Sequence, residues 1–169
     1  MGFGIIRTTG NAIGLVSMDV VKLTGIRNSY ERLQTIHQKV CELVVTHRPH
    51  ELAIEAPFYG KNVQSMLKLG RAQGVAIAAA MQAGVAVTEY SPRKIKQSIT
   101  GNGNSDKQQV LKMLQRLLSF EDSPKFYDAT DALAVAVCHH FQGKMLSESD
   151  SKKVNGWKSF VIQNPGRVK

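Results

Sequence analysis

The sequence has few cysteines and no long apolar run, and each shortage excludes a class of protein. Its two cysteines, Cys41 and Cys138, lie in separate apolar helical patterns. They lack the paired spacing of zinc ligands and indicate reduced core residues of a cytosolic protein. The longest apolar stretch, residues 74–87, is too short to span a bilayer. We therefore expect a cytoplasmic protein with no signal peptide and no membrane association.

Acidic residues are also scarce, because 13 Asp and Glu side chains stand against 22 Lys and Arg side chains among 169 residues. The formal net charge of +9 favours a polyanionic partner, with nucleic acid ahead of a membrane surface.

A nucleotide-binding loop is missing as well, since residues 101–103 lack the strand-to-helix context and the lysine of such a loop. The length fits one domain with its own core.

Hydrophobic periodicity predicts strands that alternate with helices. The pairs Asn28/Glu31 and Ser105/Gln108 each predict a capping box at a helix start. We expect an α/β fold, a mixed sheet flanked by helices over residues 1–142, followed by a mostly flexible basic tail at 143–169. The expected strands are residues 1–7, 12–23, 52–55 and 85–90, and the expected helices are residues 28–47, 62–83, 92–97, 105–117 and 127–137.

The helix expected at residues 62–83 is rich in alanine. Small side chains let another element approach a helix closely, so this composition suits burial. Burial against the sheet and burial in a subunit interface explain it equally well.

A carboxylate ends the third predicted strand, because the apolar residues 52–54 are followed by Glu55 and then by a loop. One explanation is a strand-end glutamate that turns into solvent, since Glu is rarely buried without a partner. The other is a functional carboxylate. A second acidic pair, Asp128 and Asp131, at the start of the last helix favours the functional explanation.

Asp128 and Asp131 are three residues apart, so both fall on one face of the first helical turn. Taken singly, Asp128 suits a helix N-cap and Asp131 suits a first-turn acid stabilised by the helix dipole. With Glu55 they supply hard oxygen ligands, which suit Mg²⁺ or Mn²⁺ rather than zinc. Two such ions can activate a water and stabilise the leaving oxygen of a phosphodiester. In a basic chain, metal-dependent phosphodiester chemistry is the better explanation.

Three lysines stand where phosphate contacts would be needed. Lys61 follows Glu55 by a short loop, Lys96 follows the fourth strand, and Lys107 opens a helix. A solvated basic face is the alternative explanation. Phe58 lies in the loop beside Glu55, where an apolar side chain can be a wedge between bases or part of the core.

Four segments of the sequence together match the pattern of a known family. They are EAPFYGKNVQS at 55–65, KLGRAQG at 68–74, TGNG at 100–103 and DATDALA at 128–134. In combination they resemble RuvC, the family of bacterial Holliday junction resolvases. The resemblance covers residues 1–142.

The resemblance implies an RNase H-like fold and a homodimer that nicks four-way DNA junctions symmetrically with Mg²⁺. It also implies a partner helicase that drives branch migration. By position, Glu55 is similar to the family's strand-end metal ligand, and Asp128 and Asp131 are similar to its two helical aspartates. Phe58 corresponds to an aromatic residue that wedges at the junction centre.

Further positions of the resemblance concern DNA contact and assembly. Lys96 and Lys107 correspond to lysines that contact DNA near the scissile phosphate. The helix at residues 66–80 corresponds to the family's dimer-forming helix, which favours a subunit interface.

The resemblance departs from the family at the N-terminus. The family's first strand ends in an aspartate that bridges the two metal ions, and this sequence has no counterpart of that strand. Asp19 is the nearest acid, but it belongs to another strand. We therefore expect the functional protein to be longer and the chain as written to be nearly inactive. Two other functions stay open, namely branched-DNA binding without cleavage and hydrolysis of RNA–DNA hybrids.

Overall fold

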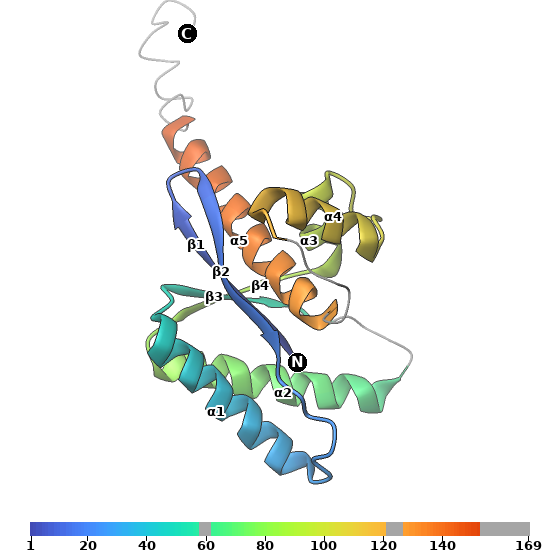
Figure 1. Cartoon of the computed structure of the whole chain (residues 1–169). Helices are drawn as coiled ribbons and strands as arrows, with labels where there is room; N and C mark the ends of the chain where they lie inside the picture. The colour runs from blue at the N-terminus through green and yellow to red at the C-terminus, as the bar shows by residue number, and fades with distance from the viewer. Residues whose placement is uncertain (58–61, 121–126, 153–169) are drawn as a thin grey trace, which may run out of the picture.

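The computed structural model describes residues 1–57, 62–120 and 127–152, and the side chains of these residues as far as residue 143 (Figure 1). In this part of the chain, strands and helices alternate after an initial hairpin, as an α/β fold requires. None of the described helices is long and apolar enough to cross a membrane.

The chain begins with an antiparallel hairpin of β1 (Gly2–Thr9) and β2 (Ala12–Val20). The tight turn between them uses Gly10 at a φ of 58°, a backbone conformation that glycine adopts without steric cost. The predicted second strand therefore exists but ends at Val20 and not at residue 23.

Helix α1 (Ser29–His47) follows and ends as predicted, with Arg48 in the left-handed conformation. Its N-cap is Asn28, whose side-chain oxygen accepts a hydrogen bond from the backbone N–H of Tyr30 at 2.8 Å. The sequence predicts a capping box in which Glu31 is the partner of Asn28, and this prediction is wrong. The bond from the second helical residue already satisfies the cap, which matches an ordinary N-cap.

Strand β3 (Glu51–Glu55) pairs in parallel with β4 (Ala86–Tyr90), and helix α2 (Val63–Gln82) connects them. The register places Glu55 opposite Tyr90 at the end of the ladder. Both strand orientations of the predicted mixed sheet are therefore present. In the described residues they form two separate two-stranded sheets, β1–β2 and β3–β4.

After β4 come α3 (Pro92–Thr100) and α4 (Lys107–Leu118). The capping box of α4 is formed by Asp106 and Gln109, so the prediction of Ser105 and Gln108 was wrong by one residue. The reason is that Ser105 is buried and its hydroxyl is already bonded to Thr100 Oγ1 at 2.7 Å and to a backbone carbonyl.

The last helix, α5 (Tyr127–Lys152), continues past Gln142, the expected end of the domain. Its first half packs against β1 without space for extra atoms. A Cβ atom on Gly4 would lie 2.8 Å from the Cα of Leu133 and would clash. Glycine at this position therefore allows the helix to lie directly on the strand.

Two groups of buried side chains form the core. In Figure 1, α3, α4 and α5 lie on one side of the strands and α1 and α2 on the other. The first group centres on Leu114, Leu133 and Cys138, and the second centres on α1 and the alanines of α2. Both cysteines are free. Cys138 is fully buried as predicted, whereas Cys41 is only partly buried against the second group.

Candidate acidic site

One pocket collects residues that are far apart in the sequence. Its polar lining consists of Glu55 from β3, Lys96 from α3, Lys107 from α4 and Asp131 from α5. The apolar lining is given by Pro92, Ile95, Val110 and Ala134. The structure thus brings together two of the three predicted carboxylates and both described lysines of the prediction.

Glu55 is held at its place by backbone contacts on two sides. The N–H of Ala56 donates to the carbonyl of Tyr90 at 2.8 Å, which continues the ladder past the end of β3. The side-chain Nε2 of Gln73 on α2 donates to the Glu55 carbonyl at 2.6 Å. These two bonds hold the main chain at the end of the strand, where Glu55 lines the pocket.

The electrostatics of the pocket act on Glu55. Burial raises the pKa of its carboxyl, and the negative charge of Asp131 raises it further. The positive charges of Lys107 and Lys96 lower it in part. Two carboxylates that repel each other in this way gain from a shared cation.

Asp131 has a direct cationic partner, because Lys107 Nζ lies 2.8 Å from its Oδ2 atom. The hydrogen bond to Asp131 raises the pKa of Lys107, so the lysine stays charged. Lys107 is the first residue of α4 and Asp131 lies near the start of α5, so the ion pair joins two helix N-terminal ends.

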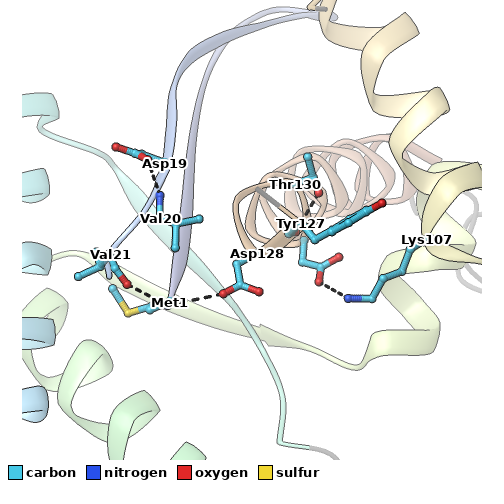
Figure 2. Close-up of polar contacts among 9 residues, drawn as sticks. Met1, Asp19, Val20, Val21, Lys107, Tyr127, Asp128 and Thr130 are labelled. Atoms are coloured by element: carbon cyan, nitrogen blue, oxygen red, sulfur yellow. Dashed lines mark hydrogen bonds and ion pairs between the residues drawn. The ribbon is translucent and has the colours of Figure 1, made fainter. Parts of the chain in front are cut away.

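Asp128 does not line this pocket in the described structure. Figure 2 shows its carboxylate directed at the N-terminal ammonium of Met1, at 3.7 Å, and that ammonium also lies near the Val21 carbonyl. The helix begins at Tyr127, so Asp128 belongs to its first turn. The alternative of an N-cap is therefore wrong, while the negative charge of Asp128 still contributes to raising the pKa of Lys107.

The oxygen donors of the pocket fit a divalent cation, although the described residues do not form a complete set of metal ligands. Among residues 1–57, 62–120 and 127–143, no three His, Cys, Asp or Glu side chains are grouped closely enough to hold a metal ion. Glu55 and Asp131 nevertheless supply hard oxygen atoms in one pocket, as Mg²⁺ and Mn²⁺ prefer. The ammonium of Lys107 now balances part of their charge.

Two predicted site residues, Phe58 and Lys61, lie outside the described residues. Conversely, no sequence pattern selects Tyr90 or His139, whose side chains are hydrogen bonded to each other at 2.8 Å. Gln73 was part of a recognised segment, but its contact with the strand of Glu55 became visible only in three dimensions.

Together, the fold and the site define a basic α/β protein with an acidic pocket, flanked by lysines, at the end of a strand. This combination of side chains has the chemistry of a phosphodiester hydrolase. The family model described as crossover junction endodeoxyribonuclease RuvC matches residues 1–139. The RuvC of Bacteroides fragilis is 52% identical over 100% of this chain and 90% of its own length. The RuvC of Porphyromonas gingivalis is 50% identical over 100% of this chain and 91% of its own length.

Solved structures agree with these sequence matches. The RuvC of Thermus thermophilus in complex with Holliday junction substrate has a TM-score of 0.80 at 32% identity, over 85% of this chain and 88% of that one. Another structure of the same protein has a TM-score of 0.77. The chain belongs to the RuvC family of crossover junction endodeoxyribonucleases. The predicted family, enzyme class and RNase H-like α/β fold are confirmed.

Proposed function

We propose that this protein is a Mg²⁺-dependent endonuclease that nicks Holliday junctions symmetrically and so resolves recombination intermediates. The observation that carries the proposal is the pocket in which Glu55 and Asp131 lie with Lys96 and Lys107. The family membership and the relative solved with a Holliday junction substrate support the same substrate class.

In this proposal Glu55, Asp131 and Asp128 hold the divalent cations, two per site, with Mn²⁺ as an accepted substitute for Mg²⁺. Bound there, the metal supplies an activated water and stabilisation of the leaving oxygen. Asp128 lies in the first turn of α5, three residues before Asp131, so it can join the set.

The lysines position the DNA. Lys107 and Lys96 border the carboxylates, where a scissile phosphate must lie to be attacked, and their charges compensate the phosphate. Phe58 and Lys61 follow Glu55 directly along the chain. In the proposal Phe58 wedges at the junction centre and Lys61 contacts the backbone, since an apolar side chain can unstack bases.

Symmetric nicking requires two active sites, which a homodimer provides. Helix α2 is the proposed interface. Its outward side chains Val63, Leu67, Leu69 and Met81 are exposed, between 49% and 65%, whereas its alanines Ala76, Ala79 and Ala80 are buried in the core shared with α1. Through the family resemblance, the proposal also includes action in the cytoplasm and together with a branch-migration helicase.

A second function is junction binding without cleavage. The observation that favours it is that Asp131, one of the proposed metal ligands, is already ion paired with Lys107 in this structure. A protein in this arrangement can contact DNA through Lys96 while Lys107 neutralises Asp131.

The test compares the wild-type chain with Asp131→Asn on a four-way junction with Mg²⁺. Resolution into paired nicks by the wild type, with cleavage at least about 100-fold slower in the variant, supports the nuclease. Equal binding of both proteins without any Mg²⁺-dependent nicks supports the binding function. Asp19→Asn is the matched control, because Asp19 is an exposed acid of β2 whose carboxylate is bonded to the neighbouring backbone N–H at 2.7 Å. Preference for an RNA–DNA hybrid duplex would contradict both functions.

A further inference from the structure

A chain of polar contacts joins α5, which carries both aspartates, to the strand pair that holds Glu55. The hydroxyl of Tyr90 on β4 lies 2.8 Å from Nδ1 of His139 on α5. The other ring nitrogen of His139, Nε2, contacts the carboxylate of Glu51 on β3. The Tyr90 and His139 rings also meet edge to face, with centroids 5.7 Å apart. Three elements that are distant in sequence are thus joined through one imidazole.

The three groups satisfy one another when the imidazole is neutral with its proton on Nε2. The Tyr90 hydroxyl then donates to Nδ1, and Nε2–H donates to the Glu51 carboxylate, so each donor has an acceptor. Burial raises the pKa of the Tyr90 hydroxyl, with smaller contributions from Cys138 and Glu51. Tyr90 therefore keeps the proton that it donates.

The acidic site is reached from these contacts through Tyr90 on β4 and through α5, which carries His139. Tyr90 is the ladder partner of Glu55, and its carbonyl accepts the N–H of Ala56 at 2.8 Å. On α5, His139 lies about two helical turns beyond Asp131, the carboxylate of this helix that lines the pocket. A shift of α5 along or about its axis would move the aspartates relative to Glu55, and the His139 contacts resist such a shift.

We propose that His139, bonded to Tyr90 and Glu51, is a positioning residue that fixes the carboxylates of α5 relative to Glu55. The proposal rests on the proposed function, in which those carboxylates share divalent cations. None of the three residues lines the acidic pocket, so they act only through the elements that carry the ligands. Loosening the contacts therefore weakens cation binding and leaves the DNA-contacting lysines unaffected.

The test measures Mn²⁺ binding to the DNA-free protein, by the electron paramagnetic resonance signal of free Mn²⁺, in Tyr90→Phe, Glu51→Ala and Glu51→Gln. Tyr90→Phe and Glu51→Ala each remove one hydrogen bond of His139, and we expect the Kd for Mn²⁺ to rise about tenfold, the lower end for second-sphere partners. Glu51→Gln keeps an acceptor oxygen, so its Kd stays within about twofold of the wild type. The double variant, Tyr90→Phe with Glu51→Ala, loses little more affinity for Mn²⁺ than either single variant, because the groups act as a unit.

Controls separate positioning from general destabilisation. Glu42→Ala removes an exposed glutamate of α1 that is paired with Lys39 at 2.8 Å, and it leaves the Kd unchanged. Metal-free junction binding also stays unchanged in every variant. Glu51 has a 58% exposed side chain, so the Glu51 variants retain the fold, and circular dichroism verifies this.

The outcomes distinguish this proposal from the proposed function. If Glu55→Gln weakens Mn²⁺ binding while Tyr90→Phe and Glu51→Ala bind it as the wild type does, His139 has no positioning role and only this inference fails. Loss of binding in Glu51→Gln equal to that in Glu51→Ala also overturns it, because charge and not the hydrogen bond would then matter. If the wild type binds no Mn²⁺, or Glu55→Gln binds it unchanged, the proposed function fails and this inference fails with it.

Discussion

Lys107 Nζ lies 2.8 Å from Asp131 Oδ2, and both residues line the pocket that contains Glu55. The two side chains are 64% and 46% exposed, so the ion pair adds little to folding stability. Its main effect is electrostatic, because the ammonium opposes the accumulation of negative charge in the pocket. The protonation of Glu55 therefore depends on Lys107.

Replacing Lys107 by Met is expected to raise the pKa of Glu55 further. The wild-type pKa is already raised by burial and by Asp131, and Lys107 is the first of the two charges that lower it. Carboxyl chemical shifts recorded against pH in the metal-free protein would measure the change. Lys39→Met is the control, since Lys39 is paired with Glu42 on α1. An unchanged or lower pKa of Glu55 in Lys107→Met would contradict the electrostatic assignment.

Glu55→Gln is expected to raise the free energy of unfolding at pH 7 while it abolishes the proposed cleavage. The folded state raises the pKa of Glu55 above its usual value of 4.5, so folding favours the protonated carboxyl. Its stabilising contribution is present below the unfolded pKa and is lost as pH rises through the folded pKa. Because Glu55 is exposed to solvent, the gain in the free energy of unfolding at pH 7 in Glu55→Gln is below about 1 kcal/mol.

Chemical denaturation at pH 7 and at pH 3.5 tests this sign. The stability difference between Glu55→Gln and the wild type should be largest at pH 7 and nearly absent at pH 3.5. A variant that is less stable than the wild type at pH 7 would show that the carboxylate is a structural ion and not a strained site residue.

Lys96→Ala is expected to weaken junction binding and to reduce its dependence on salt. If Lys96 neutralises one phosphate, the slope of log K against log salt concentration falls by about 0.9. Fluorescence anisotropy of a labelled junction, titrated at several salt concentrations, measures the slope. Lys39→Ala should leave it unchanged, and a Lys96→Ala slope equal to that of the wild type would remove Lys96 from the DNA contact.

Gly4→Ala is expected to destabilise the fold by about 1–3 kcal/mol, because overpacking forces backbone shifts. The new Cβ would lie 2.8 Å from Leu133 Cα and 2.9 Å from Leu133 N, and neither backbone atom can move without α5. Thermal unfolding measures the cost. Gly14→Ala on the neighbouring strand has nothing within 4 Å of the new Cβ, so it should be neutral or stabilising.

Most helix and strand positions could be predicted, because they depend on local periodicity, but α5 continues to Lys152 where the prediction ended at residue 137. The one-residue error at α4 arose because a serine and an aspartate stand side by side before the helix. The sequence pattern does not show that the Ser105 hydroxyl is occupied by Thr100 and that Asp106 is left to cap the helix. Side-chain hydrogen bonds within the turn before the helix thus decided between two equally good caps.

By itself, the sequence determined the α/β class, the basic charge and the carboxylates and lysines of the candidate site, because residue type and local spacing specify these. Only the tertiary structure decided which of them meet. It placed Glu55, Asp131, Lys96 and Lys107 in one pocket and directed Asp128 to the Met1 ammonium. It also joined Tyr90, His139 and Glu51. These contacts connect segments far apart in the chain, and packing of α5 against the strands, which no local pattern records, sets them.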